Sequence, residues 1–428
     1  MSKNLKRHLS FLFMVILKSN FIFSQQIETK LELSNLNNPY FKYTHYEAQL
    51  KVSHQNWKLI INPEVVDSYV GKKVLGTNFS REKFMGRFCK SVLSYDKDNF
   101  NFQIGRSPIK WGQSYEQSII QSGYAPSYDH LIFELSLNNL SAKFLAGQLG
   151  SQKIGSERIL RLISGRRLSG AFLNKKLNIS LGEQIIYTGK NRSHELFYLN
   201  PAIPYVFAAY EDNDLDVDSL NNDNSMIFID ANYNIKGKHL IYFEFIIDDF
   251  HIYDDHVQDM LGVKIGVRSH FRILNRIVNW EVELTEIDTW TYIHSGRGQF
   301  TSWQNLDHPI GHPYGSDLKS LKILSEIWLK KESIFFKAEY NRLVKGSVGL
   351  NDMWGNINSL SNSFPSSPEK TLTLIQTTIG FQLKNFSLET GYSNIPLSYD
   401  IANNLVKELS GGFFIDLKIS SRFDFNLN

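Results

Sequence analysis

Cysteine is almost absent from this chain, because its 428 residues include only one, Cys89. A single cysteine cannot form an intramolecular disulfide, and it argues against a cysteine-based zinc or redox site. The chain also lacks an uninterrupted apolar run of about 18 residues, the length of a membrane-spanning helix, anywhere beyond its first 24 residues. The sequence therefore predicts that the rest of the chain contains no helical membrane span.

Motifs of catalysis and cofactor binding are missing as well. The sequence contains no Gly-x-Ser-x-Gly elbow, no His-Glu-x-x-His helix and no phosphate-binding glycine loop. Ser269 and His270 are adjacent, so in a strand they point to opposite faces and cannot act as a pair. His308 and His312 lie in a stretch rich in Pro and Gly, which argues against a helical metal pair. We expect no enzyme activity, no metal and no cofactor.

The net charge of the chain is close to zero when residues 1–24 are not counted. Residues 1–24 combine a basic start, an apolar centre and Ser24 at the end, which is the pattern of a secretory signal peptide. Their removal takes away four basic residues and leaves 42 basic and 43 acidic ones. A near-neutral chain has no basic footprint for nucleic acid. We expect residues 25–428 to form one domain, since no Pro/Ser-rich linker divides them.

The C-terminal segment has the clearest periodic pattern. Between Phe413 and Leu427 the odd positions are apolar apart from Ser421, and the even positions from Asp416 onward are polar or charged. A period of two places these two sets on opposite faces of a strand, one suited to hydrocarbon and the other to water. The run is far longer than the roughly 5–6 residues of a soluble strand. Together with the export signal, it predicts an outer-membrane β-barrel.

Similar alternation recurs along the chain and predicts hairpins. One pairs Leu321–Leu329 with Ile334–Tyr340, and another pairs Thr371–Leu383 with Phe386–Tyr392. Barrel strands need roughly 9–11 residues to cross a membrane, and several segments reach that length. At about 22 residues for a strand and its turn, the chain has room for about 16–18 strands. We predict an all-β, transmembrane antiparallel β-barrel with short helical or irregular loop insertions.

Three segments interrupt the alternation and are predicted to be loops: 106–130, with a short helix near Tyr115–Gln121, 198–225 and 294–317. The acidic stretch 211–223 has carboxylates at every second position from Asp212 to Asp218 and could hold Ca²⁺, although its departures from the EF-hand pattern favour a solvated loop. Aromatic side chains in or beside the loops could stack on sugar rings, or form a membrane girdle; these are Trp111, Trp290, Tyr292, Trp303 and Tyr314.

Carboxylates also lie within a predicted strand, where Glu244, Ile246 and Asp248 share one face. At 3.3 Å per residue, Glu244 and Asp248 are about 13 Å apart. Paired glycosidase carboxylates are separated by roughly 5–9.5 Å, so this pair does not fit such a centre. We expect a ladder of charges facing the barrel lumen, with hydrogen bonding to glycan as the alternative.

Several short motifs occur in a characteristic order: Gly105-Arg106, Trp111-Gly112, Ser122, Asp129, Asn200-Pro201, Tyr242–Phe245, Asp248-Asp249 and Gly311–Asp317. This ordered set resembles the Wzi-type capsule assembly proteins of bacterial outer membranes. The resemblance extends from about residue 30 to the end of the chain.

This resemblance implies an outer-membrane barrel of about 18 strands with a lectin-like, non-catalytic role in holding exported capsular polysaccharide. The expected partners are surface polysaccharide, outer-membrane lipids and the barrel assembly machinery. The alternatives are a porin or substrate-specific channel, which the polar inner face would suit, and a soluble secreted β-sandwich enzyme. The candidate polysaccharide contacts are Arg106, Asp129, Arg166 and Arg167 for acidic groups, Trp111 for stacking, and Asp248, Asp249 and Asp317 for hydroxyl groups.

Overall fold

A computed structural model describes residues 25–427, apart from 39, 69, 78, 155, 191, 201–202, 206, 208–221, 250–258, 275, 294–299, 330–332 and 353–363. Residues 1–24 and most of the acidic stretch 211–223 lie outside the described residues, so the signal peptide and the calcium question stay predictions. Among the described residues, no helix is long and apolar enough to cross a bilayer.

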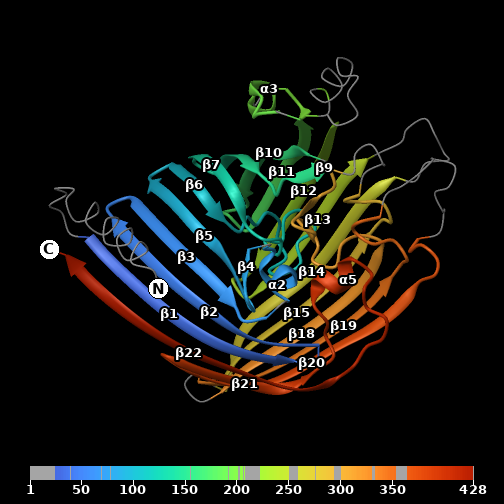
Figure 1. The fold of residues 1–428 in the computed structure, drawn as a ribbon. Coiled ribbons are helices and arrows are strands. Elements are labelled where there is room, and N and C mark those ends of the chain that lie inside the picture. The colour runs from blue at the N-terminus through green and yellow to red at the C-terminus, as the bar shows by residue number, and fades with distance from the viewer. Residues whose placement is uncertain are drawn as a thin grey trace.

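The described strands form a closed antiparallel barrel of eighteen strands, in which each strand pairs with its neighbour along the chain and β22 pairs with β1 (Figure 1). This confirms the predicted fold class. The strands are β1 (Gln25–Asn38), β2 (Phe41–His54), β3 (Trp57–Val66), β5 (Phe84–Lys97), β6 (Phe100–Ser107), β7 (Tyr128–Leu137), β8 (Leu140–Gln148), β10 (Glu157–Phe172), β11 (Leu177–Lys190), β12 (Asn222–Ile235), β13 (His239–Asp249), β14 (Met260–Ile273), β15 (Arg276–Ile287), β18 (Leu318–Leu329), β19 (Ile334–Lys345), β20 (Lys370–Leu383), β21 (Phe386–Ser393) and β22 (Gly412–Leu427).

The two ends of the barrel differ in the length of their connections. One end carries short turns, such as those at 98–99, 138–139 and 384–385, and it also holds Gln25 and Leu427. Except for the short β1–β2 turn, the connections at the other end are longer, and we call it the loop end. In bacterial outer-membrane barrels, long loops face the exterior and short turns face the periplasm.

The strands alternate as the sequence predicts. In β22, Phe413, Ile415, Ile419 and Phe423 are exposed on the outer wall, where a bilayer would cover them. In β13, Tyr242, Glu244, Ile246 and Asp248 point inward and are buried. The inner face is therefore polar and charged, and the outer face is apolar, as expected for a membrane barrel.

The loops carry the remaining elements, and several loops fold back into the barrel mouth. In Figure 1, α2 and α5 lie within the outline of the barrel, and a salt bridge of 2.7 Å between Lys73 and Asp400 joins them. These smaller elements are α2 (Gly71–Leu75), α3 (Leu196–Leu199), α5 (Ser398–Ala402), β4 (Ser80–Arg81), β9 (Gln152–Ile154), β16 (Gln304–Asn305) and β17 (His308–Pro309).

Two details of the predicted loops are wrong. The first loop is shorter than 106–130, because β6 continues to Ser107 and β7 begins at Tyr128, so Arg106 and Asp129 belong to strands. Residues Tyr115–Gln121 form bends rather than a helix. Within this segment, the backbone N–H of Ile119 binds the carboxylate of Glu244 in the barrel wall.

Candidate functional site

The loop between β6 and β7, residues 108–127, enters the lumen and is held there by Glu244. The carboxylate of Glu244 is fully buried and accepts hydrogen bonds from the backbone N–H groups of Gln113, Ser114 and Ile119, at 2.5, 2.7 and 2.8 Å. The hydroxyl of Ser118 donates a fourth, at 3.0 Å. A buried carboxylate needs such donors to offset its desolvation, so Glu244 fixes this loop as a plug.

Asp248, four residues further along β13 toward the loop end, holds a second loop in the same way. Its carboxylate accepts the backbone N–H of Tyr292 at 2.8 Å and the indole N–H of Trp303 at 2.6 Å. Tyr292 and Trp303 then pack with Trp111 and Ile119 in the main hydrophobic core. The predicted ladder of inward carboxylates is thus present, and each of its two members anchors a loop.

Asp317 anchors a third loop immediately before β18. It is fully buried and accepts hydrogen bonds from the hydroxyl of Thr289 at 3.0 Å and the backbone N–H of Val348 at 3.0 Å. Ser366 donates both its backbone N–H, at 2.8 Å, and its hydroxyl, at 2.5 Å. With its oxygens occupied by the chain's own donors, Asp317 joins the loops before β18 and after β19.

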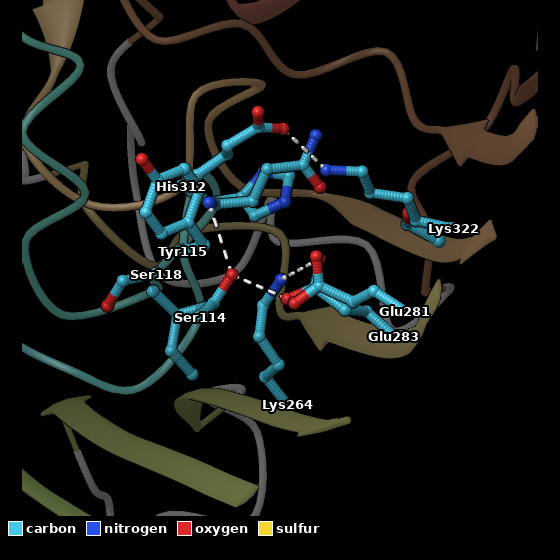
Figure 2. Close-up of polar contacts among 12 residues, drawn as sticks. Ser114, Tyr115, Ser118, Lys264, Glu281, Glu283, His312 and Lys322 are labelled. Atoms are coloured by element: carbon cyan, nitrogen blue, oxygen red, sulfur yellow. Dashed lines mark hydrogen bonds and ion pairs between the residues drawn. The ribbon is translucent and has the colours of Figure 1, made fainter. Parts of the chain in front are cut away.

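Beneath the plug, charged side chains from neighbouring strands form a buried network. Figure 2 shows Ser114 and Lys264 converging on Glu283, and Lys322 reaching into the same region. Lys264 lies 3.4 Å from Glu283, and Lys322 lies 2.8 Å from Glu116 of the plug. Arg268 pairs with Glu281 at 2.5 Å. Opposite charges therefore meet inside the barrel, which reduces the cost of burying them.

His312 lies above this network in the loop before β18, and it is fully buried. Its Nδ1 accepts the backbone N–H of Tyr314 at 3.3 Å, which leaves the proton on Nε2. Burial and the nearby positive charge of Lys264 hold the pKa of His312 well below its ordinary value. The ring is therefore neutral, and it fills space in the loop before β18 without adding a charge.

In the structure, Arg106 and Asp129 form a pair, which the sequence did not predict. They are direct partners on β6 and β7, and the guanidinium grips the carboxylate with two bonds of 3.0 and 2.6 Å. Both point to the outer wall, on the same face as the exposed Ile104 and Leu131. This pair lies beside the loop end and is accessible.

Arg166 and Arg167 are neighbours on β10, so they lie on opposite faces of the wall. Arg166 points outward, pairs with Glu183 of β11 and lies 4.4 Å from the centre of the Tyr205 ring. Arg167 points into the lumen and pairs with the buried Asp230 at 2.7 Å. The two arginines therefore cannot act on one ligand from the same side.

Four of the five aromatic residues lie in packed loops rather than on an exposed surface. Trp111, Tyr292, Trp303 and Tyr314 are buried inside the barrel, so they do not form a membrane girdle, and a sugar contact of Trp111 stays a prediction. The Trp111 ring lies against Phe228, with 5.7 Å between the ring centres. Trp290 is half-buried. Aromatic character near a loop did not distinguish a packed plug from an exposed platform, because both need large flat side chains.

The eight predicted contact residues do not form one cluster. Arg106, Asp129 and Arg166 lie on the outer wall, while Arg167, Trp111, Asp248 and Asp317 are inside the barrel; Asp249 lies opposite Met260 where the β13–β14 register shifts. A polysaccharide contact by any of them stays a prediction. The sequence reasoning missed Arg161, although a cation within Ile159-Leu160-Arg161-Leu162-Ile163 is a usable signal of an inward polar site.

Comparison with protein families identifies the family of this chain. Residues 23–395 match the family described as capsule assembly protein Wzi. The chain belongs to the Wzi family. No curated protein sequence matches it significantly. Membership and the barrel together make this an outer-membrane β-barrel of a capsule assembly family, as the ordered motifs predicted.

Solved structures with the same fold include the Wzi protein of Escherichia coli, described as a carbohydrate-binding β-barrel of the outer membrane involved in group 1 capsule assembly. The likeness has a TM-score of 0.63 at 13% identity and covers 93% of this chain and 84% of that one. A BenF-like porin from Pseudomonas fluorescens gives 0.52 at 9% identity, with coverage of 94% and 99%. At these identities, both likenesses concern the fold.

Proposed function

We propose that this Wzi-family barrel binds surface polysaccharide at its loop end, in a lectin-like role without catalysis. The observation that carries the proposal is the way the loops are held. Glu244, Asp248 and Asp317 each bind loop backbone, so the described parts of these loops are held in fixed positions at the barrel mouth. Rigid loops on a scaffold are suited to recognition because little entropy is lost when a ligand binds.

The same contacts support a role without catalysis. The buried carboxylates in the lumen are occupied by donors of the chain itself, as for Glu244 and Asp317. A glycosidase needs two carboxyl groups that face a substrate across roughly 5–9.5 Å. The family resemblance to a carbohydrate-binding Wzi barrel supports a binding role.

Binding of the polymer would be multivalent. A single shallow contact with a sugar is weak, but a polymer that engages many copies in the membrane gains avidity through effective concentration. Arg106 and Asp129 are the accessible members of the predicted set. Outer-membrane lipids and the barrel assembly machinery are the other partners that we propose.

The first test is binding of the detergent-purified protein to polysaccharide extracted from its own cells. We expect saturable binding that the same polymer competes and unrelated polymers do not. A folded, heat-modifiable barrel that fails to bind would contradict the proposal. Steady single-channel conductance steps from the same preparation would instead favour the channel alternative.

A further inference from the structure

A small polar cavity opens among three loops at the loop end. Its volume is about 180 Å³, and its lining includes Lys72 of α2, Ser151 before β9, Arg161 of β10, and Gln304 and Asp307 around the β16–β17 hairpin. A cavity needs a volume of roughly 10–15 Å³ to hold one water molecule. This one can therefore accept a ligand with many atoms.

Arg161 brings a buried positive charge to this cavity. The side chain is 2% exposed. Its Nε and Nη2 donate to the backbone carbonyls of Phe300 and Ser302, at 2.5 and 2.7 Å. No carboxylate forms an ion pair with it in the described part of the chain, and its Nη1 makes no hydrogen bond there. A buried cation without a paired anion is costly, so the site favours a ligand that supplies negative charge.

Gln304 leaves a second polar group without a partner. The residue is 5% exposed, and its buried side-chain oxygen Oε1 makes no hydrogen bond to any residue that the structure describes. Buried amides are almost always hydrogen-bonded, because an unsatisfied one costs roughly 1–3 kcal/mol. A ligand hydroxyl in the cavity would satisfy it.

The mouth of the cavity is also charged. Lys72 and Asp307 form a salt bridge of 2.5 Å there, and their side chains are 48% and 29% exposed, so solvent reaches them. The lining thus holds two cations, Lys72 and Arg161, against one carboxylate. The net charge of the lining is positive by one, which attracts an anion from solution.

We propose that this cavity binds the carboxylate of an acidic sugar unit, such as a uronic acid, within the surface polysaccharide. Arg161 offers the free N–H groups at the Nη1 end of its guanidinium to the carboxylate, Lys72 adds charge at the mouth, and Gln304 Oε1 accepts a ring hydroxyl. The proposal rests on the proposed polysaccharide-binding function and names the sugar that this function would recognise.

The test measures binding of a galacturonic acid trisaccharide to the purified, folded barrel by calorimetry. The neutral galactose trisaccharide serves as the ligand control. The variants are Lys72→Ala, Arg161→Lys, which keeps the buried charge but loses the fork, and Ser151→Trp, which fills the cavity. Lys73→Ala is the matched control, because Lys73 follows Lys72 in α2 and pairs with an aspartate but does not line the cavity.

We expect the acidic trisaccharide to bind and the neutral one not to bind. The dissociation constant should rise about tenfold in Lys72→Ala and Arg161→Lys, as expected for a lost charge-assisted contact, and binding should vanish in Ser151→Trp. Lys73→Ala should bind like the unmodified protein. No binding of the acidic trisaccharide, or equal binding by all four variants, would overturn the cavity site.

The same variants separate this inference from the proposed function. Binding of the cells' own polysaccharide should fall when its carboxyl groups are chemically reduced, and it should fall in Ser151→Trp. Polysaccharide binding that survives both changes would overturn the acidic-sugar site and leave the proposed function standing. Failure of the unmodified barrel to bind its own polysaccharide, while it binds the trisaccharide, would overturn the proposed function alone.

Discussion

Single buried carboxylates hold the loops of this barrel, and Glu244 is the clearest example. It satisfies three backbone N–H groups and one hydroxyl of the plug. Such charge-assisted bonds contribute about 1.5–3 kcal/mol each. The residue lies in a strand, but its effect is on a loop more than a hundred positions away in sequence.

Replacement of Glu244 with alanine should release the plug while the barrel still forms. The N–H groups of Gln113, Ser114 and Ile119 would lose their acceptor, and we expect the loop to lose about 3 kcal/mol or more of local stability. Hydrogen exchange of residues 108–127 and ion conductance measure this. Glu244→Gln, which keeps one acceptor oxygen, should have an intermediate effect, and unchanged exchange in both variants would refute the anchor role.

Acidification should loosen the loop that carries His312. Burial and Lys264 keep the folded-state pKa of His312 well below the value of about 6.5 in a free chain. Below that pH, the detached loop binds a proton and the folded loop does not, so stability falls as pH falls. The loss is roughly 1.4 kcal/mol for each pH unit until the folded pKa is reached.

Protease cleavage of the loop at pH 7 and pH 5 measures the effect, with His312→Gln as the control that cannot titrate. The titration of Asp288 has the opposite effect on the stability of the loop. Burial raises its pKa to about 6, so its protonation stabilises the folded loop as the pH falls below that value. The difference between the unmodified protein and His312→Gln isolates the histidine. Equal pH dependence in both proteins would contradict the assignment.

At the scale of elements, the plug is closely packed around Gly112. Gly112, in the plug, has a φ of +106°, and a Cβ there would lie 2.1 Å from Ser118 Oγ and 2.8 Å from Glu244 Oε1. The plug therefore needs glycine for two reasons, the positive φ and the close approach of the carboxylate. Periodicity in the sequence predicts strands, but it carries no information about such a contact.

Gly112→Ala should disturb the plug more than Gly237→Ala disturbs a short turn. Gly237 also has a positive φ, +69°, but a Cβ there meets nothing within 4 Å. The control should cost about 1 kcal/mol of backbone strain, and Gly112→Ala should cost more, because it adds a steric clash and its φ lies further from the left-handed helical region. Hydrogen exchange in the plug and at the turn would compare the two, and similar exchange changes would argue against close packing at Gly112.

At the scale of the whole molecule, two opposite faces of one sheet meet different solvents. Lys264 points into the lumen and the adjacent Ile265 points outward, where it is 48% exposed. Because of this alternation, charged side chains line the inside of the barrel wall and apolar side chains cover its outside. Closure by the β1–β22 pair removes the free edges that a membrane cannot tolerate.

Ile265→Arg should therefore destabilise the barrel in lipid by roughly 2–4 kcal/mol if the residue lies near the bilayer midplane. Leu274→Arg is the control, since Leu274 lies in the short turn between β14 and β15, where the cost should be about 0–1 kcal/mol. Urea titration of vesicle-folded protein, read by heat-modifiable gel migration, gives both values. An equal cost for the two variants would place Ile265 outside the membrane.

The sequence by itself determined the barrel, its approximate strand number and the face of each strand, because a period of two is written locally in residues such as Phe413–Leu427. The ordered motifs also indicated the family. Only the tertiary structure decided the roles of the loop residues. Trp111 became core, Asp317 became an anchor and Arg161 became a buried cation beside a cavity, since each role depends on partners distant in sequence. Local patterns specify which face a side chain takes, and only packing specifies what it meets there.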